Sequence, residues 1–139
     1  MGNEIAALAG LLCIVPAMAH GHSAAERYVL QERCGKRAAE VFAKEYTPTQ
    51  TTKDGGAATF SYENHYSEKL NKCFFLEISV FYHKGSTSTQ MRLFDLNENK
   101  EYGHYWESSQ STFRDCMVVE ARCFTERDWR RLAKPYLED

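Results

Sequence analysis

Apolar and polar residues alternate most regularly between Cys73 and His83. One set of alternate positions is entirely apolar, and the other mixes aromatic and polar residues. The apolar set is Phe74, Leu76, Ile78, Val80 and Tyr82, and the mixed set is Phe75, Glu77, Ser79, Phe81 and His83. Because the side chains of a β-strand point alternately to its two faces, this pattern predicts a strand with one dry face and one partly hydrated face.

Shorter patterns on either side predict further strands. Residues 57–66 place Phe60, Tyr62, Asn64 and Tyr66 on one face, residues 90–96 and 101–106 follow short turns, and residues 116–122 predict a fifth strand or a hairpin. Residues 47–56, TPTQTTKDGG, have no apolar period and predict a loop. Strands joined by short turns favour an antiparallel meander, because a parallel sheet needs long crossover connections.

Helical spacing is found before and after the strand region. Within residues 23–46, Leu30, Cys34, Ala38 and Val41 form one apolar stripe, and Ser23 with Glu26 three residues later predicts a capping box. Cys34 is therefore expected to point toward whatever the helix covers.

A second capping pattern predicts a short helix at the end of the chain. Thr125 and Asp128 have the spacing of a capping box, and Trp129, Leu132 and Ala133 follow at helical positions. We expect Pro135 to end this helix. The complete pattern predicts an α+β fold, in which an N-terminal amphipathic helix packs on an antiparallel β-meander of about four to five strands and a short helix follows.

The first residues of the chain resemble a secretory signal peptide. Residues 5–19, IAALAGLLCIVPAMA, contain no charge but are too few for a bilayer span, which needs about 18 or more apolar residues. The small-x-small pattern Ala17-Met18-Ala19 is typical of a cleavage site, although the leader has no Lys or Arg. We expect residues 1–19 to be removed and residues 20–139 to form one exported domain, secreted or periplasmic. The alternative is a buried N-terminal helix.

Cleavage would remove Cys13 and leave four cysteines, Cys34, Cys73, Cys116 and Cys123. An even number in a small exported domain predicts two disulfides with three possible connectivities. Cys116 and Cys123 are too far apart for a bridge in a straight strand or a helix, but they face each other if the chain turns at Val119-Glu120. That turn has no Gly, Asn or Pro. We favour Cys34–Cys73 with Cys116–Cys123, and the other two connectivities stay open.

Composition and charge limit the partners. The chain has 139 residues, 43% of them hydrophobic, and a net charge of −2, so it has neither the composition of a disordered protein nor the basic surface of a nucleic-acid or anionic-membrane binder. We expect no nucleic acid, no stable membrane insertion after cleavage, and a protein as the possible partner. The aromatic residues Tyr102, Tyr105 and Trp106 are candidates for an exposed interaction patch.

Three candidate sites for chemistry are weak. Asp95-x-Asn97-x-Asn99-x-Glu101 resembles half of an EF-hand loop but has Lys100 where Gly is needed and Trp106 where Glu is needed. His65, His83 and His104 lie on or beside predicted strands and could converge on a metal or act as a base. Cleavage after Ala19 would leave His20-Gly21-His22, which resembles an amino-terminal copper motif.

No local signature of a hydrolase, a zinc enzyme or a phosphate-binding loop is present in the sequence. We therefore assign no catalytic residue, metal ligand or cofactor. The expected function is that of a small exported non-catalytic module, for binding, inhibition or accessory assembly. The alternatives are a copper-binding protein that uses His20-Gly21-His22 and a small enzyme of unrecognised type.

Overall fold

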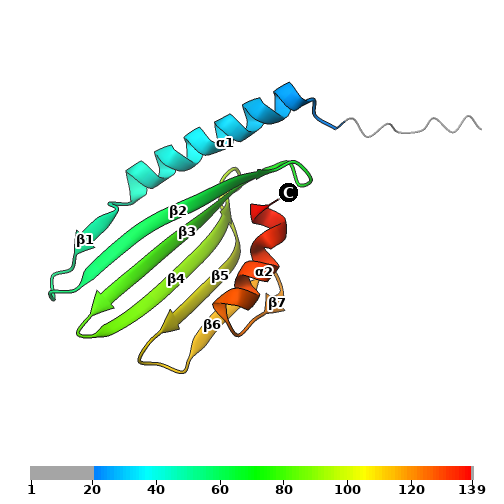
Figure 1. Cartoon of the computed structure of the whole chain (residues 1–139). Coiled ribbons are helices and arrows are strands. Elements are labelled where there is room, and N and C mark those ends of the chain that lie inside the picture. The colour runs from blue at the N-terminus through cyan, green and yellow to red at the C-terminus, as the bar shows by residue number, and fades with distance from the viewer. Residues whose placement is uncertain (1–20, 139) are drawn as a thin grey trace, which may run out of the picture.

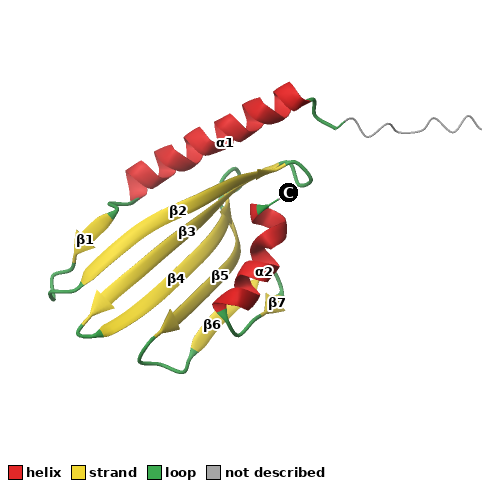
Figure 2. Ribbon diagram, in the orientation of Figure 1, coloured by secondary structure: helices red, strands yellow, loops and turns green. Residues whose placement is uncertain are grey.

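The computed structural model describes residues 21–138, so the predicted signal peptide and His20 lie outside the described residues. The described residues form helix α1 (Ala24–Glu45), a sheet of seven strands and helix α2 (Glu126–Leu137). Figure 2 shows how these elements are arranged. The strands are β1 (Thr49–Thr51), β2 (Ala57–Ser67), β3 (Lys72–His83), β4 (Ser86–Asp95), β5 (Lys100–Ser108), β6 (Arg114–Val118) and β7 (Ala121–Arg122). Every strand pairs antiparallel with its neighbour in sequence. The α+β class and the meander are as predicted.

The strand number is higher than expected because two edge strands are very short. β1 is three residues of the segment predicted as a loop, and β7 is two residues that complete the hairpin with β6. Neither is long enough to show an apolar period. All three residues of β1 are exposed, so its pairing with β2, and not burial, determines the strand.

The two helices lie on opposite faces of the sheet (Figure 1). Trp129 of α2 clusters with Phe74 and Leu76, the dry face predicted for β3. On the other face, Phe42 of α1 packs on Tyr62, which stacks on Phe75 at a centroid distance of 5.3 Å. The long helix therefore covers the mixed face, and the short helix covers the apolar face.

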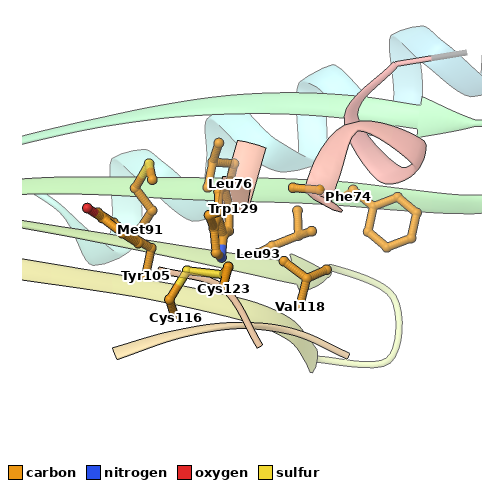
Figure 3. Packing of buried hydrophobic residues seen from close by; sticks show 10 residues of the cluster. Phe74, Leu76, Met91, Leu93, Tyr105, Cys116, Val118, Cys123 and Trp129 are labelled. Carbon is orange, nitrogen blue, oxygen red and sulfur yellow. A yellow bond between two sulfur atoms is a disulfide. The ribbon is translucent and has the colours of Figure 1, made fainter. Parts of the chain in front are cut away.

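The main core lies under α2 (Figure 3). Trp129 is fully buried among Leu76, Leu93 and the Cys116–Cys123 disulfide, and its Nε1 donates a hydrogen bond to the Met117 carbonyl at 3.2 Å. A smaller cluster under α1 holds Cys34, Tyr66 and Cys73.

Both helices begin where predicted. Ser23 caps α1 through a reciprocal capping box with Glu26. Thr125 caps α2 by accepting from the Asp128 backbone N–H, while its hydroxyl donates to the Asp128 carboxylate at 2.8 Å.

The expected end of α2 at Pro135 is wrong, because the helix continues to Leu137 with Pro135 inside it. Tyr136 packs edge-on against Phe74 and Tyr102 at centroid distances of 5.3 and 5.4 Å. This aromatic packing favours one more turn and offsets the hydrogen bond that proline removes.

Candidate functional site

α1 covers only part of its sheet face. In β3 the residues Phe75, Glu77 and Ser79, which point toward α1, are buried. In the central parts of β4, β5 and β6 burial alternates: positions facing the α1 side are partly or fully exposed, and those facing α2 are buried, namely Met91, Leu93, Gly103, Tyr105, Cys116 and Val118. We call this uncovered area the open half of the sheet and define it by Gln90, Arg92, Phe94, His104, Trp106 and Met117.

The open half is a compact set because its residues lie in register. Arg92 of β4, His104 of β5 and Met117 of β6 form one cross-strand row, and Gln90 and Trp106 belong to the next row. Trp106 packs against Phe113, whose side chain is exposed, with ring centroids 5.9 Å apart. Trp, Phe, Met and Arg are the residue types enriched where proteins contact one another.

Arg92 is held in place at the border with α1 by a buried carboxylate. Its Nε and Nη2 donate to Oε2 of Glu77 at 3.0 and 2.7 Å, and the Ser79 hydroxyl donates to the other oxygen of Glu77 at 2.9 Å. Burial alone would lower the pKa of Arg92, but its hydrogen bond with Glu77 raises it, so the guanidinium stays charged. Its Cζ atom lies 4.9 Å from the Phe94 ring centroid, which adds a cation–π contact.

His104 lies in the centre of the open half between two carboxylates. Its Nδ1 lies 2.8 Å from Glu101 and its Nε2 lies 3.2 Å from Asp115. Burial alone would lower the pKa of His104, but the two carboxylates raise it above its ordinary value. Both ring nitrogens are within hydrogen-bond distance of carboxylate oxygens, so neither is open to a metal or to a substrate proton in this arrangement.

A groove of about 520 Å³ adjoins the open half along the edge of α1. We call it the α1 groove. It is lined by Arg37, Val41, Glu45, Tyr46, Phe75, Arg92, Phe94, Leu96 and Asn99. Its volume is within the range of about 300–1,000 Å³ usual for ligand pockets.

The three histidines do not meet. His65 pairs with Phe74 on the α2 face, His83 lies at the end of β3 with its Nδ1 3.3 Å from Asp54, and His104 belongs to the open half. Within residues 21–138 no group of three side chains could hold a metal ion.

The EF-hand-like segment is a hairpin turn. Asp95 is fully buried, and it accepts from Lys72 Nζ at 2.5 Å and from the Asn97 backbone N–H at 2.9 Å. In the copper motif, His22 is exposed and His20 lies outside the described residues.

Of the three residues of the predicted aromatic patch, Trp106 alone belongs to the open half. Tyr105 is 1% exposed in the core under α2, and burial followed by a hydrogen bond to Glu107 raises its pKa to about 12. The register shifts between Leu93 and Phe94, so Tyr102 is an extra residue between two paired positions and packs against Phe74 on the α2 side. The other members of the open half were missed, although the strand predicted over residues 90–96 already placed Gln90, Arg92 and Phe94 on one face.

The two disulfides follow the favoured connectivity. Cys34 on α1 is bonded to Cys73 on β3, and Cys116 to Cys123 across the β6–β7 hairpin, with Cα atoms 5.4 and 5.0 Å apart. The hairpin turns at Val119, which adopts a positive φ of 56° that is rare for a β-branched residue.

Neither helix in residues 21–138 is long and apolar enough to cross a lipid bilayer. No protein-family model, no curated protein and no solved structure matches this chain, so the open half and the α1 groove are the basis for a function.

Proposed function

We propose that this chain is a small exported, non-catalytic binding module that docks onto a protein through the open half of the sheet. The observation that carries the proposal is the change in burial across the sheet. The residues facing α1 are buried in β3, but in β4 to β6 Arg92, Phe94, Trp106 and Met117 are only half-buried. Within residues 21–138, α1 lies mainly over β2 and β3, and α2 lies on the other face of the sheet.

The chemistry of the open half supports a protein as the partner. Arg92 is balanced by Glu77, and His104 lies between two carboxylates, so the surface has no excess of positive charge for a nucleic acid. The half-buried Trp106 offers a large rigid contact area, and Trp is the residue type most enriched among those that dominate binding energy.

Export is supported by the leader pattern and by the disulfides. Disulfides persist in oxidising compartments and are rare in the cytosol. Intact-mass measurement of the protein from culture medium or periplasm tests this part: a chain starting at His20 is expected, and an intracellular chain retaining Met1 would contradict export.

Site-specific photocrosslinking tests the docking surface in producing cells. A photoreactive residue at Gln90, which pairs with Trp106, is expected to give one discrete adduct with a protein. The matched position is Tyr28, 68% exposed on α1, where no adduct is expected. Adding Trp106→Ala to the chain that carries the photoreactive residue at Gln90 should weaken the adduct about tenfold. The proposal fails if Gln90 gives no adduct or if both positions give the same one.

A further inference from the structure

We propose that the α1 groove binds a short peptide segment of the protein partner that carries an acidic side chain among apolar residues. This inference rests on the proposed function and assigns the chemistry that the partner brings to it.

The charged donors of the groove come from both walls. Arg37 on α1 donates Nη2 to the Leu96 carbonyl at 3.3 Å, which holds its guanidinium across the groove toward the end of β4. It forms no ion pair with a carboxylate in residues 21–138. An arginine has five N–H donors, so most of those on Arg37 are open to a ligand.

Arg92 faces Arg37 from the sheet. Its Nε and Nη2 are used by Glu77, which fixes the position of the guanidinium before any ligand arrives. Glu77 itself is 4% exposed and already accepts from Arg92 and Ser79, so it offers little to a ligand. The remaining acid is Glu45 at the far end of the groove. Arg92 is also hydrogen-bonded to Tyr46. Arg37 is therefore the guanidinium of the groove with free donors, and a carboxylate fits it better than an amine.

The floor and the length select a peptide. Phe75, Phe94 and Leu96 form an apolar floor between the two arginines. Arg37 and Glu45 are eight residues apart on α1, which corresponds to about 12 Å of helix. An extended peptide of about three or four residues spans that distance. A segment with one acidic and two apolar residues fills the groove, with its carboxylate at Arg37.

Two matched probes test the inference on the folded domain. N-acetyl-Phe-Asp-Phe-amide and the same peptide with Asn in place of Asp are titrated into ¹⁵N-labelled protein, and backbone amide shifts locate the contact. The Asp peptide is expected to shift amides around Arg37, Phe94 and Leu96 and to bind about three to ten times more tightly than the Asn peptide.

The variant Arg37→Gln should remove this preference and leave the two peptides equal. Arg131→Gln is the control, because it removes a guanidinium that is 75% exposed on α2, on the opposite face of the sheet, and should leave the preference intact. Unchanged amide spectra of the two free variants away from the substitutions show that both are folded. Octanoate is the third probe, and it separates a peptide from a free amphipathic carboxylate.

The inference is overturned if the Asp and Asn peptides bind equally to the unmodified protein, if the shifts lie outside the groove, or if octanoate binds there and the peptide does not. Any of these results with a specific adduct at Gln90 leaves the proposed function standing. Peptide binding in the groove without an adduct at Gln90 overturns the proposed docking surface instead.

Discussion

Removal of the Cys34–Cys73 disulfide should cost more stability than removal of Cys116–Cys123. A bridge restricts the unfolded chain more strongly when it closes a longer loop. The bridges join cysteines 39 and 7 positions apart, for which the chain-entropy relation gives costs of about 3.9 and about 2.4 kcal/mol at 25 °C. All four cysteines are between 3% and 7% exposed, so replacement of each pair by alanine loses similar packing. The expected difference of about 1.5 kcal/mol therefore comes from the unfolded state.

Urea unfolding of the two paired variants, Cys34→Ala with Cys73→Ala and Cys116→Ala with Cys123→Ala, measures this difference. Trp129 is fully buried and reports loss of the core by fluorescence. With a denaturant slope of about 1–3 kcal/mol/M, the two midpoints should differ by about 0.5–1.5 M. The unmodified protein under reducing conditions should be less stable than either variant. Equal midpoints, or a lower midpoint for the Cys116 and Cys123 variant, would refute the loop-length argument.

Three further changes have defined outcomes. Val119→Gly should raise the free energy of unfolding by about 0.5–1 kcal/mol, because relief of a strained left-handed residue exceeds the added freedom of the unfolded chain; an unchanged or lower melting temperature would contradict this. The pKa of His104 is raised in the folded protein, so its contribution to stability is complete below the ordinary pKa of 6.5 and is lost as pH rises through the folded pKa. NMR titration of His104 measures the folded pKa. The variant His104→Gln should remove this part of the pH dependence of the unfolding free energy. Trp129→Ala should cost about 3–5 kcal/mol of unfolding free energy in urea titrations, and a cost below about 1 kcal/mol would show that the core closes over the missing ring.

Much of the fold could be predicted from local patterns. Burial determines both patterns: the period of two in β3 and the apolar stripe of Leu30, Cys34 and Ala38 in α1 mark the side chains that become buried. Local geometry favoured the observed connectivity without excluding the other two. Turn chemistry argued against a bend at Val119, but the antiparallel pairing of β6 with β7 and the bridge beside it stabilise that bend.

The candidate site was harder to predict, because it depends on which part of the sheet α1 covers. Phe75 and Phe94 are neighbours in register on the same face, yet one lies under α1 and the other is half-exposed. Nothing in the two strands distinguishes them, since the position of the helix over β2 and β3 decides the outcome. Tyr102 lies on the α2 side because the pairing of β4 with β5 shifts by one residue. A sequence period of two does not reveal this register shift.

If the chain is exported as proposed, the order of its cysteines has a consequence for how the disulfides form. Each bridge joins two cysteines that are neighbours in the order Cys34, Cys73, Cys116, Cys123. When the chain crosses a membrane with its N-terminus first, both cysteines of the first bridge therefore emerge before Cys116. Such a chain can form the bridge between α1 and β3 in the oxidising compartment while the other two thiols have not yet crossed the membrane. Vectorial delivery would then produce the native pairs in sequence, without a mispaired intermediate that an isomerase must repair.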